Sequence, residues 1–207
     1  MFLMLKRKSC HPSLGCGNSL LFALLVLVWG IPVSSFAAGK GGASVDDWPQ
    51  FLLGIAGGVT AHELGHVVVA GAHNYRLDHD GLSIVYHPDF RSRSERLRVA
   101  SAGFQGQWLA AEIAFASGDR PGSFATGVIC GHLATSLAYL VVLKNHPLGD
   151  TVSMAMASDL SVDQVASLAA LPALLDLWRL AADAPPAWVP RLSLGLKGAG
   201  LAAVWSF

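Results

Sequence analysis

A histidine pair inside an apolar segment constrains this chain more than any other feature of its sequence. Residues 62–66 read His-Glu-Leu-Gly-His, and the flanking residues 51–61 and 67–72 are apolar or small. Side chains four residues apart share one face of a helix, so both imidazoles can reach one metal ion. Two neutral histidine nitrogens suit Zn²⁺. We therefore expect a zinc site on a helix long enough to cross a bilayer.

Glu63 directly follows the first histidine of this motif. A carboxylate there can take a proton from a water molecule on the metal, as in H-E-x-x-H metalloproteases. A charged glutamate beside two histidines is costly in lipid, so it requires a partner and a function. The alternative is a pair of core histidines with a buried glutamate. Chance rarely produces the motif here, because the chain has eight histidines but only three glutamates.

The composition indicates a membrane protein. Of the 207 residues, 53% are hydrophobic and only 14% are charged, against about 25% in soluble domains. The apolar residues form long blocks, which predicts a multi-pass protein with the lipid bilayer around it. The net charge is zero, so no basic field points to nucleic acid. Three cysteines do not make a disulfide framework.

The N-terminal segment, residues 1–38, has two interpretations. A basic start, an apolar run at 20–33 and small residues at 34–39 are typical of a signal peptide. The run is also nearly long enough to remain as a first transmembrane helix. Residues 39–207 are expected to form the single functional domain.

The apolar blocks predict an all-α membrane protein with five to six transmembrane helices. A β-branched, alternating stretch at 81–86 predicts one short strand in the polar loop 73–98. That loop is rich in arginine, which places it on the cytoplasmic side. The expected spans after the N-terminal segment are 49–72, 97–117, 124–143, 164–182 and 188–207.

The histidine motif supplies only two ligands, whereas a catalytic zinc site usually has three from the protein. The extended soluble pattern H-E-x-x-H-x-x-G-x-x-H would need glycine at position 69 and histidine at position 72. Val69 and Ala72 stand there instead. The third ligand must come from elsewhere in the chain, and an acidic side chain is the usual alternative.

Taken together, these motifs make the chain resemble a divergent branch of the site-2 protease family of intramembrane zinc metalloproteases. In that family a Gly-Pro-x-x-Asn-like element follows on the next helix. Here Gly103-Phe-Gln-Gly-Gln107 occupies that place, with Phe104 for the proline and Gln107 for the asparagine. The family's third ligand is an aspartate in a later Asn/Pro/Asp-type motif. The segment Asn145-His-Pro-Leu-Gly-Asp150 is similar but shorter.

The resemblance implies a zinc-dependent endopeptidase of the bacterial inner (cell) membrane that cleaves membrane-embedded, single-span substrates. His62, His66 and Asp150 would bind zinc, and Glu63 would be the general base. Gln105 and Gln107 would bind substrate, and the 81–86 strand would pair with an unwound segment of it. The alternative is a non-enzyme, either a protein with a structural zinc site or a metal transporter. A structural site would be closed by four protein ligands.

The third ligand has four acidic candidates. Asp150 follows residues 145–149, which can bring irregular backbone into a protein-lined cavity. The alternative is that Asp150 caps a helix that begins at residue 151. Asp176 is well inside an expected span and is the second choice. Glu112 lies about 10 Å too far outward, and Asp159 is placed to cap the next helix.

Overall fold

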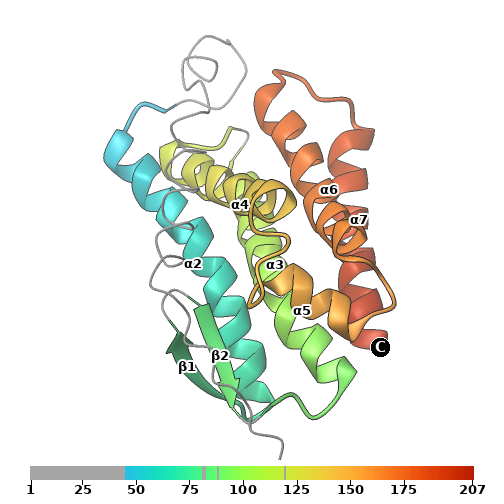
Figure 1. Cartoon of the computed structure of the whole chain (residues 1–207). Helices are drawn as coiled ribbons and strands as arrows, with labels where there is room; N and C mark the ends of the chain where they lie inside the picture. Colours follow the sequence, from blue (N-terminus) through green and yellow to red (C-terminus); the bar gives the residue numbers. More distant parts are fainter. Residues whose placement is uncertain (1–44, 81–82, 88, 119) are drawn as a thin grey trace, which may run out of the picture.

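A computed structural model describes residues 45–207 except 81–82, 88 and 119, and shows a helical bundle with one β-hairpin (Figure 1). The expectation of a mainly helical chain is confirmed, and the expected signal peptide or first span lies outside the described residues. The elements are α2 (Trp48–Ala72), β1 (Arg76–Asp80), β2 (Ser83–His87), α3 (Arg93–Ala116), α4 (Ser123–Val141), α5 (Asp150–Ala157), α6 (Val162–Ala181) and α7 (Trp188–Ser206).

Helix α2 carries the histidine motif and matches the helix expected over 49–72. The Asp47 side chain accepts a hydrogen bond from the Gln50 backbone N–H at 3.0 Å and caps the first turn. Pro49 stands in that turn, where no intrahelical donor is lost. After Ala72 the chain turns through Asn74, whose φ of 60° is left-handed. Asparagine tolerates that conformation, so the helix ends there and a strand follows.

The hairpin lies at the C-terminal end of α2. Strands β1 and β2 are antiparallel, with Leu77 opposite Tyr86. Both residues pack on a small core that includes Ala70 of α2 and Val99 of α3. Strand β2 agrees with the expected strand as far as the described residues go. Strand β1 was not predicted, because its sequence Arg-Leu-Asp-His-Asp is too polar to show an alternating apolar pattern.

Helix α2 approaches both α3 and α4 through residues without bulky side chains. A Cβ on Gly58 would lie 2.5 Å from the Val128 carbonyl oxygen of α4, and one on Gly65 would lie 2.1 Å from the Ala102 carbonyl oxygen of α3. Such contacts bring the helix backbones together, as small residues do at membrane helix interfaces. These small residues of α2 therefore form its interface with two helices.

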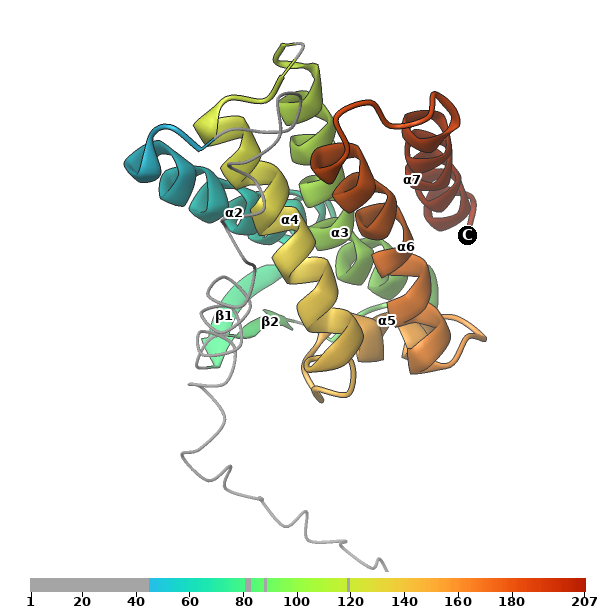
Figure 2. The same ribbon diagram turned by 90° about the horizontal axis from the view of Figure 1, so that it is seen from above.

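Helix α4 lies in the middle of the bundle, with α2 on one side and α6 on the other (Figure 2). In its most apolar stretch 72% of the residues are buried, whereas the corresponding share for α2 is 22%. Helix α2 therefore exposes a broad apolar face, which includes Leu52, Leu53, Leu64 and Val68.

The expected five to six transmembrane helices are wrong. Within the described residues, only α2 and α4 are long and apolar enough to cross a membrane. The pair α5 and α6, which is bent by 118°, would make a third span if it crosses as one unit. The segments expected at 97–117 and 188–207 do form helices, α3 and α7, but both carry too many polar and charged residues to qualify.

Those polar residues are paired inside the protein. Asp176 of α6 is fully buried and accepts hydrogen bonds from Lys197 and Ser193 of α7, at 2.5 and 2.7 Å. Lys197 also contacts Glu112 of α3, and Arg179 of α6 bridges both acids. This network joins three helices. The apolar-block pattern at 97–117 and 188–207 treats each segment separately and does not show these pairs between helices, so it predicted two spans there.

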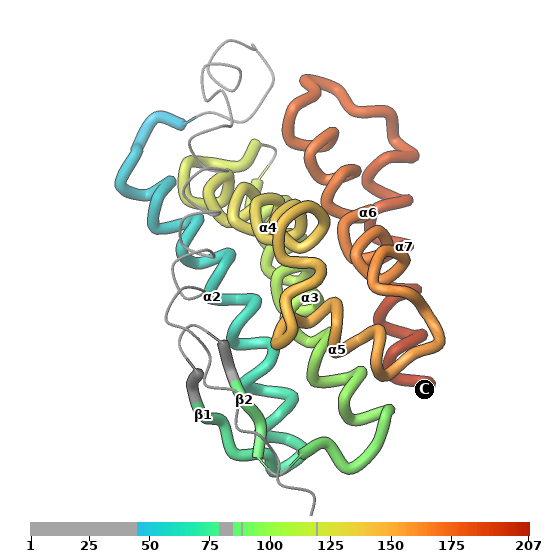
Figure 3. Tube along the Cα trace, viewed as in Figure 1, coloured from blue at the N-terminus to red at the C-terminus, as the bar shows by residue number. Residues whose placement is uncertain are grey.

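Helix α5 was not among the expected spans, and a helix here entered only as the alternative in which Asp150 caps a helix that begins at residue 151. The tube in Figure 3 follows the chain from α4 through a short loop into α5, which lies beside α3. The next helix, α6, begins with a capping box between Ser161 and Gln164. The short α5 carries the chain back under α4 and brings Asp150 toward α2.

The helix ends sort into two groups. At one end, the Ser123 hydroxyl of α4 accepts hydrogen bonds from the backbone N–H groups of Asp46 and Asp47, each at 3.0 Å. At the other end lie the hairpin, the arginine-rich start of α3 and the C-terminus (Figure 1). Such grouping is what a cytoplasmic 73–98 loop requires, and the side of the membrane stays a prediction.

The tight interface between α2 and α4 predicts opposite effects at two adjacent glycines. Gly58→Ala should lower the thermal unfolding midpoint of the purified protein in detergent by several degrees, because its Cβ would strike the Val128 carbonyl. Gly57→Ala is the matched control, since its Cβ would meet only side-chain carbons at 3.7 and 3.8 Å. That variant should be as stable as wild type or more so. Equal midpoints for both variants would contradict the packing.

Candidate metal centre

The two motif histidines lie on the buried side of α2. The buried residues of this helix are spaced three or four apart, which forms one stripe: Phe51, Gly54, Gly58, His62, His66 and Ala70. The two imidazoles are 2% and 3% exposed, and their ring centroids are 4.9 Å apart. The helix thus presents both rings to α3 and α5, one turn apart.

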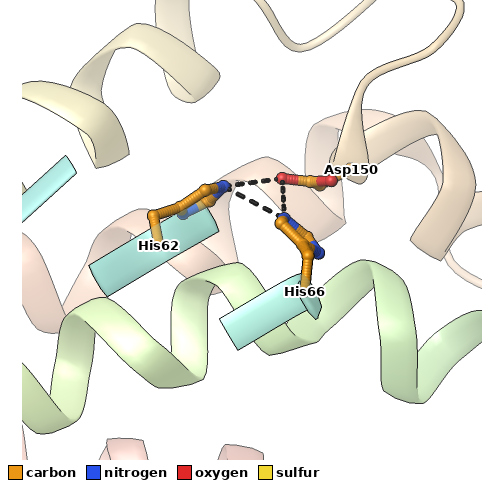
Figure 4. Close-up of side chains that lie close together, drawn as sticks. All are labelled: His62, His66 and Asp150. Atoms are coloured by element: carbon orange, nitrogen blue, oxygen red, sulfur yellow. Dashed lines mark hydrogen bonds and ion pairs between the residues drawn. The ribbon is translucent and has the colours of Figure 1, made fainter. Parts of the chain in front are cut away.

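Asp150 joins the two histidines (Figure 4). Its Oδ2 atom lies 2.9 Å from His62 Nε2 and 3.2 Å from His66 Nε2, and the two nitrogens are 3.3 Å apart. Asp150 is the first residue of α5, after Gly149. The alternative in which Asp150 caps a helix starting at residue 151 does not describe this arrangement, because the carboxylate contacts the histidines.

This trio can hold a metal ion, and it is the only such group of histidine, cysteine or acidic side chains among the described residues. Four ligands that surround zinc tetrahedrally at about 2.1 Å lie roughly 3.4 Å from one another. The observed donor separations of 2.9 to 3.3 Å need only slight widening to reach that value. The donor set, two imidazoles and one carboxylate, is one that catalytic zinc sites use.

Gly103 of α3 leaves room for an ion beside the trio. A Cβ at this position would lie 2.4 Å from His66 Nε2 and 2.5 Å from His62 Nε2. Any larger residue would therefore occupy the space in front of both donor atoms. Gly103 belongs to the element that resembles the family motif, and the structure gives it a physical reason to be glycine.

Each histidine is held by a hydrogen bond on its other nitrogen. His66 Nδ1 lies 2.8 Å from the backbone carbonyl of Val99, which can only accept, so this nitrogen carries the proton. His62 Nδ1 lies 3.1 Å from Gln107 Oε1. With Nδ1 engaged in this way, each Nε2 faces Asp150 and is the atom available as a metal ligand.

The two glutamines expected to bind substrate are engaged within the protein. Gln107 is fully buried and places its amide between His62 and Ser136, with Nε2 donating to the Ser136 hydroxyl at 2.8 Å. Gln105 donates to the Ser101 hydroxyl at 2.8 Å and accepts from the Trp205 indole at 3.1 Å. A substrate would have to break these contacts, so the structure puts Gln107 behind the metal ligands rather than beside a substrate.

Glu63 differs from the histidines in its surroundings. It is exposed, and among the described residues it has no hydrogen bond or ion pair. Its carboxylate nevertheless lies near the trio, because its charge acts on Tyr86 of β2 together with that of Asp150. Burial raises the pKa of the Tyr86 phenol, and these two negative charges raise it further. Glu63 therefore presents an exposed carboxylate beside the ligands.

Two tyrosines near the trio were missed by the sequence analysis. Tyr139 of α4 stacks on the His62 ring, with centroids 5.6 Å apart, and its phenol interacts with Asp150. Tyr86 reaches the same neighbourhood from the hairpin. No sequence pattern connects either residue with the histidine motif, since both are brought there by packing.

The rival acidic residues are all engaged elsewhere. Asp176 and Glu112 pair with Lys197 and Arg179. Asp159 is exposed and pairs with Arg93 at 2.8 Å, and it does not cap α6, which begins after Ser161. His132 is buried with Nε2 at 3.3 Å from Asp176 and is not part of the trio.

Comparisons with known proteins leave this site to be judged on its own geometry. No family model matches the sequence, and neither curated proteins nor solved structures give a match.

Asp150 and Asp176 should respond differently to the same substitution. Asp150→Asn removes a charged ligand, so we expect the zinc affinity of the purified protein to fall at least tenfold, to about the extent seen for weakened metal sites. Asp176→Asn should leave the zinc content of the folded protein near wild type while lowering stability, because Lys197 loses its buried counter-charge. Zinc loss in Asp176→Asn with retention in Asp150→Asn would reverse the assignment.

Gly103 provides a second test of the site. Gly103→Ala should reduce bound zinc per protein severalfold or more, because the added methyl group would fill the space at both Nε2 atoms. Gly71→Ala is the control on α2, since nothing lies within 4 Å of its Cβ position. Metal analysis after dialysis against a zinc buffer gives the readout. Wild-type zinc content in Gly103→Ala would show that the ion, if bound, lies elsewhere.

Proposed function

We propose that this chain is a membrane-embedded, zinc-dependent endopeptidase that cleaves peptide bonds of membrane-protein substrates. The observation that carries the proposal is the combination of a three-ligand site with an unpaired carboxylate next to it. His62, His66 and Asp150 supply the ligands, and Glu63 is the exposed carboxylate on the same helix. Three protein ligands leave a position for water or substrate, whereas a structural zinc site is closed by four.

The chain's own residues would divide the chemistry among them. A zinc ion held by the trio would supply Lewis acidity toward a peptide carbonyl and acidify water. Glu63 would accept the proton of the attacking water and return it to the leaving amine. The two histidines are held by burial and by their second hydrogen bonds, so they would not need to move during the reaction.

The position of the site along α2 supports a substrate in the membrane. His66 lies six residues before the last residue of α2, which corresponds to about 9 Å along the axis. The trio is thus inside the span but close to the end that carries the hairpin. A single-span substrate would meet it a short way below the surface, after its helix had unwound locally. The free edge of the hairpin is suited to pair with such a segment.

The rival functions, a structural zinc site or a metal transporter, have less support. A transporter needs polar residues along a path, and the second buried polar group, Asp176 with Lys197, is neutralised by internal ion pairs. Neither function gives Glu63 a role. The bacterial inner membrane, as the location, stays a prediction.

The Glu63→Gln variant tests the proposed chemistry. It keeps all three ligands, so zinc content should stay near wild type, while cleavage of co-expressed single-span substrates should fall about a hundredfold or more. Asp159→Asn is the matched control, because this exposed carboxylate pairs only with Arg93 at the surface. It should keep both zinc and cleavage. Undiminished cleavage by Glu63→Gln would remove the mechanism.

A further inference from the structure

We propose that Gln107, supported by Ser136, is a positioning residue that sets the proton and the orientation of the His62 ring for metal binding. This inference rests on the proposed metal site and assigns a role to a residue that was expected to touch substrate. Gln107 comes from α3, His62 from α2 and Ser136 from α4, so the chain of contacts joins the three helices around the site.

The first step concerns the proton on His62. Its Nε2 faces Asp150 and His66, and its Nδ1 faces Gln107 Oε1 at 3.1 Å. The amide oxygen can only accept, so Nδ1 must carry a proton, and the neutral ring that binds a metal then has its lone pair on Nε2. With the amide reversed, its N–H group would demand a lone pair on Nδ1, and the proton would move to Nε2. Metal binding through Nε2 would then be blocked.

The second step concerns the amide itself. Its Nε2 donates to Ser136 Oγ at 2.8 Å, which leaves the oxygen for His62. Gln107 is 0% exposed and Ser136 is 1% exposed, so water does not compete for either end. Close packing also holds the backbone that carries this side chain. A Cβ on the preceding residue, Gly106, would lie 2.3 Å from the Ala61 carbonyl oxygen of α2.

The third step is the contrast with His66. Its Nδ1 is held by a main-chain carbonyl, that of Val99, which no substitution can remove. The Nδ1 atoms of both histidines therefore face a carbonyl oxygen, which belongs to the backbone for His66 and to a side chain for His62. Of the two Nδ1 contacts, only the one at His62 can be removed by substituting the partner residue. Partners of this kind typically alter metal affinity ten- to a hundredfold when they are lost.

The test measures zinc affinity of the purified full-length protein by competition with a chelator. Gln107→Met keeps the length of the side chain but removes the acceptor, and we expect its affinity to fall about ten- to a hundredfold. Gln107→Glu should rescue binding to within a few-fold of wild type, because a carboxylate accepts from Nδ1 and the Ser136 hydroxyl can turn to donate. Gln105→Met is the matched control. Its contacts are with Ser101 and Trp205, so the affinity should not change.

The outcomes separate this inference from the proposed function. A wild-type protein that binds no zinc would overturn the metal site itself. Zinc binding by wild type together with unchanged affinity in Gln107→Met would overturn only the inference. Equal losses in Gln107→Met and Gln107→Glu would do the same, because a packing role would not distinguish the two. If Gln107→Met does not fold, Ser136→Ala removes one small hydroxyl and should weaken zinc severalfold, and wild-type affinity in that variant would count against the proposal.

Discussion

The close approach of α2 to its two neighbours is the constraint on which the rest of this structure depends. His62 and His66 lie on the same stripe of α2 as Gly54 and Gly58, so the face that packs tightly is also the face that carries the ligands. Because α3 contacts α2 at Gly65, its own Gly103 comes directly against both imidazoles. Larger residues at these contacts would move α3 away and separate Gln107 from His62.

A second constraint is the cost of polar groups in an apolar bundle. The described residues meet it in two ways: the polar atoms of the trio lie within 3.3 Å of one another and Gln107 and Val99 contact the other histidine nitrogens, while Asp176 is paired with Lys197. Unpaired, each of these charges would be expensive in lipid. The pairing lets helices α6 and α7 remain in the bundle despite their low hydropathy. The trio and the ion-pair network around Asp176 share no residue, so the carboxylates of the network are not ligands of the candidate metal site.

The sequence predicted the parts of the fold that local pattern determines. The helix at 49–72 follows from its apolar length, and the histidine motif within it predicts a shared face. Asp150 came from a resemblance together with the irregular Asn-Pro-Gly segment before it. The number of spans was wrong because the apolar blocks at 97–117 and 188–207 were counted as spans although they carry charged residues such as Glu112 and Lys197, which the structure pairs across helices. The role of Gln107 was out of reach for the same reason, since its partners lie 45 and 29 residues away.

The contrast between Glu63 and its neighbours bears on the proposed chemistry. A ligand must stay in one place and in one protonation state, which burial and fixed hydrogen bonds provide for His62 and His66. A general base must change its protonation state in every cycle, so a permanent partner would oppose it. Helix geometry allows adjacent residues to serve as fixed ligand and as general base, because a step of one residue turns the side chain by about 100° around the helix axis. His62 thereby faces the core, and Glu63 faces outward, which is the position that the proposed general base requires. A site that only stored or carried metal would gain nothing from an exposed, unpaired carboxylate beside its ligands.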